Sequence, residues 1–80
     1  MTSIDLSDFV ILVKNQFSEE IRDDINEQTD FKALKEWSSL QTIIVVNEIH
    51  KHYNVILNSD DFSAAQNLGQ LYEIVESRHI

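Results

Sequence analysis

The sequence predicts an all-α domain with three main helices, one short helix and a long loop between the first two main helices. Along most of the chain, apolar residues recur at steps of three and four, the spacing that stacks side chains on one face of a helix. Residues that cap helices stand directly before the later apolar runs. No proline is present to break a helix, and no second strand accompanies the short aliphatic run at 55–57.

The first helix is expected to place five apolar residues on one face, namely Leu6, Phe9, Val10, Val13 and Phe17. Ser3 or Ser7 could cap its start, because a serine oxygen accepts a hydrogen bond from an otherwise unpaired backbone N–H. The acid-rich stretch 18–30 that follows has only Ile21 and Ile25 as apolar anchors. We therefore expect a long loop with one loose helical turn, and a loop of this length in a small domain usually has a role.

The second main helix is expected over the apolar run 40–53, after two serines. Phe31, Leu34 and Trp37 lie three apart before it and are expected to pin the long loop to the core. Aliphatic residues cover well over half of the circumference of this helix, which indicates either a central helix or one with a second face for a partner. They are Leu40, Ile43, Ile44, Val45, Val46 and Ile49. The helix should end near Tyr53 and Asn54, because asparagine tolerates the left-handed conformation.

The last third of the chain predicts a buried loop at 55–57, then a short helix and a final long one. The cap-forming cluster 58–61 is expected to open the short helix around 62–65. Asn67 is expected to cap the final helix, with Gly69 in its first turn, where a glycine does least harm. Its inward residues would be Leu68, Leu71, Tyr72 and Val75, and its outward residues Glu73, Glu76 and Arg78.

The composition of the chain excludes several classes of function. The chain has 80 residues, which suits one domain over 1–80, and fourteen acids against six Lys and Arg give a net charge of −8. Such a charge cannot neutralise phosphates, so we expect no nucleic-acid partner. The absence of cysteine excludes disulfides and thiolate chemistry, and a single glycine excludes a glycine-rich phosphate loop. We therefore expect that the chain is not an enzyme.

The histidines and the paired carboxylates are expected to be ordinary surface groups. His50 and His52 lie two apart on one helix, so they point to different faces and cannot chelate one metal together. Glu48 and His52 alone would make a weak site, and His79 is expected to fray. The acid pairs 23–24 and 60–61 are expected to be solvated, since acid–base catalysis needs two carboxyls in different environments across a cleft.

Ser39 is the candidate of most interest. A serine nucleophile needs a histidine base, and the central histidines lie more than two turns further along the same helix. Local chemistry alone therefore predicts a helix cap at Ser39.

The stretch 37–42, Trp-Ser-Ser-Leu-Gln-Thr, resembles the Asp-Ser-Leu motif at the start of the second helix of acyl carrier proteins. The likeness runs from about residue 31 to 75 without a gap and includes Tyr53, Leu57 and the two cap clusters of the last third. It implies a four-helix acyl-carrier-like bundle in which Ser39 carries covalent 4′-phosphopantetheine, derived from coenzyme A. A helix N-terminus suits a phosphodiester, because its free N–H groups and positive dipole end favour an anion.

This sequence departs from the family pattern at three places. Ser38 stands where the family has Asp, and Lys-Glu-Trp at 35–37 stands where it has a glycine. The family's second helix is acidic, whereas 40–53 has Glu48 as its single acid. A stand-alone carrier for one dedicated pathway, of the fatty-acid, polyketide or nonribosomal type, is therefore the leading interpretation. Partner enzymes are expected to contact Ser38, Leu40, Gln41, Ile43, Ile44 and Asn47.

The resemblance also implies partners. A phosphopantetheinyl transferase, which supplies Mg²⁺, would modify Ser39, and other enzymes would load and use the acyl or aminoacyl thioester. We expect a monomer, with no metal site of its own and no membrane contact. Because residues 1–5 contain no basic residue and no apolar run is long enough for a signal or a span, we expect the cytoplasm. The alternative is a small acidic interaction module in which the apolar helix binds a partner and no prosthetic group is attached.

Overall fold

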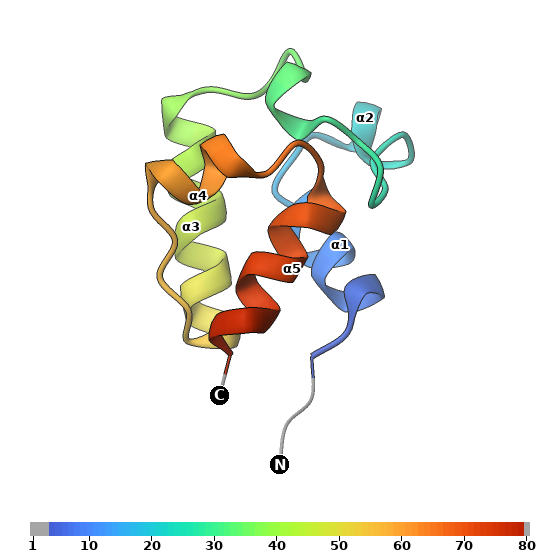
Figure 1. The fold of residues 1–80 in the computed structure, drawn as a ribbon. Helices are drawn as coiled ribbons and strands as arrows, with labels where there is room; N and C mark the ends of the chain where they lie inside the picture. Colours follow the sequence, from blue (N-terminus) through green and yellow to red (C-terminus); the bar gives the residue numbers. More distant parts are fainter. Residues whose placement is uncertain (1–3, 80) are drawn as a thin grey trace.

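All the regular elements that the computed structural model describes, over residues 4–79, are helical (Figure 1). The all-α prediction is confirmed. The three longer helices are α1 (Leu6–Lys14), α3 (Ser39–Tyr53) and α5 (Leu68–Arg78). Two short helices, α2 (Glu19–Arg22) and α4 (Ser59–Ala64), and a 3₁₀ turn at Phe31–Ala33 complete the order. None of these helices, within 4–79, is long and apolar enough to cross a membrane.

The three longer helices stand side by side around one core, and α1 packs against both α3 and α5 (Figure 1). The short helix α4 packs against α5. The long connection from α1 to α3 crosses the end of the bundle that lies furthest from the beginning of α1 and the end of α5 (Figure 1). Because α3 begins at that same end, its first residues lie at the rim of the molecule, next to the long loop.

The cap of α1 differs from the expectation. Asp5 precedes the helix, and its carboxylate accepts a hydrogen bond from the Asp8 N–H (3.1 Å). Ser7 lies inside the helix, so it cannot cap it, and Ser3 lies outside the described residues. Aspartate caps helices as well as serine does, and here it stands at the right position. The helix ends at Lys14, and Phe17 is buried beyond its end.

The long loop is held to the core as predicted. Its single helical turn is α2, Ile25 is buried and Ile21 is half-buried. The buried Phe31 ring stands edge-on to Trp37, with 5.1 Å between ring centroids, and edge-on to Phe62, at 6.0 Å. The other residue predicted to pin the loop, Leu34, is half-buried against the same core.

Gly69 lies at a close approach between two backbones, a feature that the sequence did not suggest. Its N–H donates to the Glu27 carbonyl of the long loop (2.8 Å), and a Cβ at this position would lie 3.2 Å from that oxygen. The first turn of α5 and the long loop therefore touch through their backbones. A side chain at residue 69 would require the Glu27 carbonyl to shift by a few tenths of an ångström.

The end of α3 and the following loop agree with the prediction in most respects. Asn54 has a φ of 57°, and its N–H donates to the His50 carbonyl. Val55 and Leu57 are buried, but Ile56 is 68% exposed, so the buried loop has one apolar side chain in solvent. The short helix α4 begins at Ser59, earlier than expected, because Asn58 and Asp61 form a reciprocal capping box at its start.

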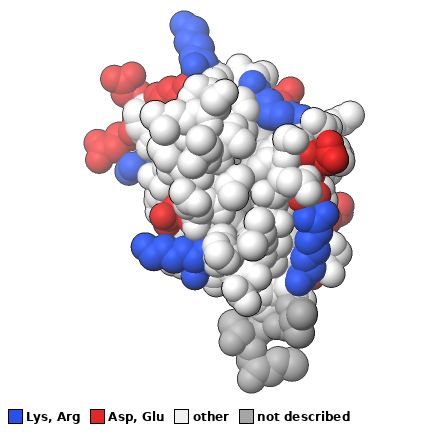
Figure 2. All heavy atoms as spheres, turned by 90° about the vertical axis from the view of Figure 1, so that its left-hand side faces the viewer, with Lys and Arg blue, Asp and Glu red and all other residues white. Residues whose placement is uncertain are grey.

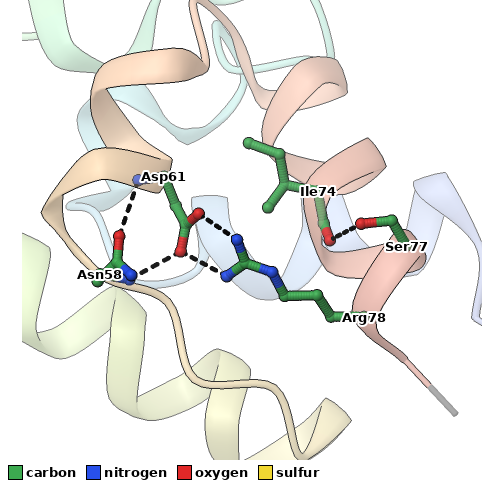
Figure 3. A network of polar contacts seen from close by, with 5 residues as sticks. All are labelled: Asn58, Asp61, Ile74, Ser77 and Arg78. Carbon is green, nitrogen blue, oxygen red and sulfur yellow. Dashed lines mark hydrogen bonds and ion pairs between the residues drawn. The ribbon is translucent and has the colours of Figure 1, made fainter.

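The prediction that Asp61 is solvated was wrong. Asp61 is buried, and the Arg78 guanidinium reaches back from the end of α5 to bind its carboxylate in bidentate fashion, at 2.5 and 2.6 Å (Figure 3). The carboxylate also accepts the Asn58 N–H (2.9 Å). His79 follows α5 as its C-cap: its N–H donates to the Val75 carbonyl (2.9 Å), and its ring stands edge-on to Tyr53.

Candidate functional site

The two adjacent serines at the start of α3 make different contacts. Ser38 has an extended backbone, and its hydroxyl oxygen accepts a hydrogen bond from the Gln41 N–H (3.1 Å). Its carbonyl accepts both the N–H and the hydroxyl of Thr42, each at 2.9 Å. Ser38 is therefore the N-cap, and the interpretation of Ser39 as the cap was wrong. Ser39 is the first residue of the helix.

The Ser39 hydroxyl is exposed and takes part in none of the hydrogen bonds among residues 4–79. Two backbone N–H groups beside it, those of Ser39 and Leu40, belong to the helix positions that have no partner within α3. The first turn of α3 contains no acidic residue. The site thus combines a free hydroxyl, unpaired donors and the positive end of a 15-residue helix, all of which favour a covalently held anion.

The residues that follow Ser39 separate into an exposed group and an anchored one. Leu40 is 67% exposed and Ile43 is 57% exposed, and Asn47 lies four residues further along the same side. Ile44 is half-buried. Gln41, in contrast, is half-buried, and its side-chain amide donates to the Gln16 carbonyl at the end of α1 (2.8 Å).

A contact that the sequence did not reveal lies just before the serines. The Glu36 carboxylate accepts the Ser18 N–H at 2.9 Å, and its other oxygen accepts the Ser18 hydroxyl. These two hydrogen bonds lower the pKa of Glu36, and slight burial opposes them. The two residues lie 18 apart in the sequence, a separation at which no helical or turn pattern relates them. Only the fold brings them together.

The side of the molecule formed by α3 and the loop after it is almost free of charge at its centre. Figure 2 shows that side, with Lys, Arg, Asp and Glu placed around its margin. Glu48 is the single acid of α3, and one of its carboxylate oxygens lies 3.6 Å from the ring of His52. Leu40 and Ile43 are thus exposed on a helix with little net charge, and Ile56 is exposed in the loop after it, although the whole chain has −8.

The remaining candidates stay at the surface. His50 and His52 are exposed, as are Asp23 and Asp24, in agreement with the prediction of solvated groups. Over residues 4–79, no three His, Cys, Asp or Glu side chains lie close enough to hold a metal ion. The hollow of about 430 Å³ between the long loop and α5 is lined by Glu27, Gly69 and their neighbours, and Ser39 is not part of it.

Comparison with known families gives a match over most of the chain, whereas comparison with single proteins gives none. The family described as "Phosphopantetheine attachment site" matches residues 12–75, most of the chain. Searches of curated proteins and of solved structures returned no match. Members of the family bind 4′-phosphopantetheine covalently on a serine, interact with phosphopantetheinyl transferases and acyl-handling enzymes, and are not catalysts by themselves.

The match covers the last turn of α1 from residue 12, the long loop, all of α3 and α4, and most of α5. It thus includes the helix start at which Ser39 offers a free hydroxyl. Together with the helical bundle, it confirms the resemblance noted in the sequence. The chain belongs to the family of phosphopantetheine-binding carrier domains.

Proposed function

We propose that this protein is an acyl carrier protein in which Ser39 is the attachment point for 4′-phosphopantetheine. The main support for the proposal is that the Ser38 hydroxyl accepts a hydrogen bond, whereas the Ser39 hydroxyl makes none among residues 4–79. Because Ser38 caps α3, the Ser39 hydroxyl is not needed for the helix and remains free for esterification. Ser38 lacks this freedom, since its oxygen already accepts the Gln41 N–H.

The chain's own groups suit the attachment. The Ser39 oxygen would form the new bond to phosphorus, while coenzyme A gives up adenosine 3′,5′-bisphosphate. The N–H groups of Ser39 and Leu40 and the positive end of α3 would stabilise the negative charge of the phosphodiester. When attached, the prosthetic group supplies the thiol that holds an acyl or aminoacyl thioester. The chain needs this supply, because it has no cysteine.

We further propose that partner enzymes bind the exposed side of α3. Leu40, Ile43 and Asn47 face solvent, and Ser38 and Ile44 flank them. Gln41 remains a predicted contact, although its amide is bonded to the Gln16 carbonyl. With Glu48 as the single acid of α3, a dedicated set of partners in one biosynthetic pathway fits better than the general fatty-acid enzymes. We expect residues 1–80 to act as one carrier domain, monomeric and in the cytoplasm.

Intact-mass measurement after co-expression with a broad-specificity phosphopantetheinyl transferase tests the proposal. The wild-type protein should gain the mass of one phosphopantetheinyl group, and Ser39→Ala should abolish the gain. Ser59→Ala is the matched control, because Ser59 is the exposed first residue of α4 just as Ser39 is of α3. This control should be modified fully.

Two other results would contradict the assignment. A gain that survives in Ser39→Ala and disappears in Ser38→Ala would place the attachment one residue earlier. No gain with several transferases would favour the interaction module, for which the exposed Leu40 and Ile43 are the supporting observation.

A further inference from the structure

We infer that Glu36 and Gln41 are positioning residues for Ser39, because they fix the chain on both sides of this serine to the joint between α1 and α2. We call this pair of contacts the two-point tether; it joins Glu36 to Ser18 and Gln41 to Gln16. The inference rests on the proposed function of Ser39, and it adds a structural requirement for its modification.

The first point of the tether lies three residues before Ser39. The two Glu36 carboxylate oxygens accept the N–H and the hydroxyl of Ser18, which stands directly before α2. Two hydrogen bonds to one carboxylate fix both its position and its orientation. The same contact satisfies the Ser18 N–H, at the start of a helix that has no side-chain cap of its own.

The second point lies two residues after Ser39. The Gln41 side-chain amide donates to the Gln16 carbonyl (2.8 Å), while the Gln41 backbone N–H donates to the Ser38 hydroxyl (3.1 Å). Gln41 therefore links the cap of α3 to the end of α1. Leu40 lies between this point and Ser39 and is exposed, so it adds little packing there.

The anchor of the tether is itself well fixed. Three consecutive backbone carbonyls just after α1, starting with its C-cap Asn15, accept hydrogen bonds from side chains of other elements. Arg22 donates to the carbonyls of Asn15 (3.2 Å) and Phe17 (3.0 Å), and Gln41 takes the carbonyl between them. Phe17 and Val13 are buried in the core next to this joint. The joint can therefore hold the start of α3 in place.

Few apolar contacts hold Ser39 itself. Ser38, Ser39 and Leu40 are all exposed, and Trp37 is the half-buried residue before them. Loss of the tether should therefore leave the core intact and let the first turn of α3 move. A transferase would then meet the Ser39 hydroxyl in the correct position less often, which lowers kcat/KM without unfolding the protein.

A double-mutant cycle on the rate of modification tests the inference. The apo protein is modified with coenzyme A and a transferase, as wild type, Glu36→Ala, Ser18→Ala and the double variant. Each single variant should lower kcat/KM by about threefold to tenfold, the effect of one or two lost hydrogen bonds. The double variant should be no slower than Glu36→Ala alone, because Ser18→Ala removes one of the two hydrogen bonds that Glu36→Ala already removes.

The cycle separates positioning from direct contact with the transferase. If Glu36 acted by direct contact with the transferase, Ser18→Ala would leave kcat/KM unchanged, or its loss and that of Glu36→Ala would be independent and multiply in the double variant. Either result would overturn the inference. Glu36→Gln, which keeps an acceptor for Ser18, should recover part of the rate. Glu20→Ala is the matched control, since it removes an exposed acid close to Ser18 that makes no hydrogen bond or ion pair among residues 4–79. It should be modified at the wild-type rate.

Amide hydrogen exchange gives a second readout that does not require modification. Glu36→Ala and Gln41→Met should speed exchange in the first turn of α3, at Gln41 and Thr42, and leave the amides around the buried Ile49 unchanged. Unchanged exchange in both variants would overturn the tether even if Ser39 is modified. Faster exchange in a protein whose Ser39 is never modified would support the tether and defeat the proposed function instead.

Discussion

At the scale of single residues, the adjacent serines at the start of α3 have opposite roles, and their energetic effects should differ. Ser38→Ala removes the acceptor of the Gln41 N–H and should lower the free energy of unfolding by about 1 kcal/mol. Ser39→Ala removes a hydroxyl with no hydrogen bond within 4–79 and should change that free energy little. Urea denaturation of the apo proteins measures both. A larger loss in Ser39→Ala would mean that Ser39 has a structural role.

Sequence reasoning proposed Ser39 as the attachment point through the motif, and its prediction that Ser39 caps α3 was wrong. Two consecutive serines before an apolar run predict a cap equally well at either position, because the pattern does not show which one has extended backbone dihedrals. The structure decides this through the Ser38 backbone, with φ −154° and ψ 175°. The bonds of Glu36 and Gln41 were also invisible in the sequence, since their partners lie 18 and 25 residues away.

At the scale of elements, the pairing of α4 with α5 gives the stability a pH dependence. The hydrogen bonds from Arg78 lower the pKa of Asp61, the Asn58 N–H lowers it further, and burial opposes both. The unfolded carboxyl titrates near a pKa of about 3.9. Because the folded pKa lies lower, the stabilisation is complete well above pH 4 and is lost as the pH falls through the folded pKa.

Asp61→Asn tests this contribution. The variant keeps an acceptor for the Asn58 N–H and loses the charge that binds Arg78, so at pH 7 it should lose about 1–3 kcal/mol of unfolding free energy. Chemical denaturation at several pH values should show the difference from wild type shrinking below about pH 4. Asp60→Asn, at the exposed neighbouring position, is the control and should stay close to wild type. A difference that does not change with pH would exclude the ion pair as its source.

The contribution of core residues to the free energy of unfolding can be tested within one helix. Ile49 and Ile43 both belong to α3, but Ile49 is fully buried whereas Ile43 is 57% exposed. Ile49→Ala should lower the unfolding free energy by about 2–5 kcal/mol, and so should Leu71→Ala at the buried face of α5. Ile43→Ala should cost far less, because its side chain already contacts water. Equal losses at the two α3 positions would mean that Ile43 is covered in solution.

The sequence predicted the elements well where one helix face or one local cap determines them. The stop of α3 at Asn54 and the cap of α5 at Asn67 are such local signals. It failed where a contact joins distant segments. Neither the ion pair of Asp61 with Arg78, 17 residues apart, nor the contact of Gly69 with Glu27 follows from periodicity.

At the scale of the whole molecule, charge and apolar surface are separated. Residues 1–36 contain nine of the fourteen acids, whereas α3 has one. The side around α3 shown in Figure 2 has an uncharged centre. Leu40 and Ile43 of α3, and Ile56 of the loop after it, are exposed. Charge steers encounters and rejects wrong partners more than it adds affinity. Because α3 has a single acid, it should bind poorly to enzymes that recognise an acidic carrier helix.

Partner choice follows from this separation. We expect a ketosynthase of general fatty-acid synthesis, which binds an acidic carrier helix, to use the loaded protein poorly. Native partners should bind through apolar and uncharged contacts, with weak salt dependence. Gln41→Glu with Asn47→Glu would add acids, but it would also place a carboxylate against the Gln16 carbonyl and break the tether. Asn47→Glu with Lys51→Glu avoids this, because both side chains are exposed and make no hydrogen bond or ion pair among residues 4–79.

In a kinetic comparison, the Asn47→Glu/Lys51→Glu variant should be used better than wild type by the general ketosynthase, and the gain should disappear at high salt as added charges are screened. The same variant should be used less well by a native partner. Gln28→Glu, which adds an acid in the exposed long loop, should change neither rate. Efficient use of the wild-type protein by the general ketosynthase would contradict dedicated partners, because a nearly neutral α3 would then suffice for an enzyme built to bind an acidic one.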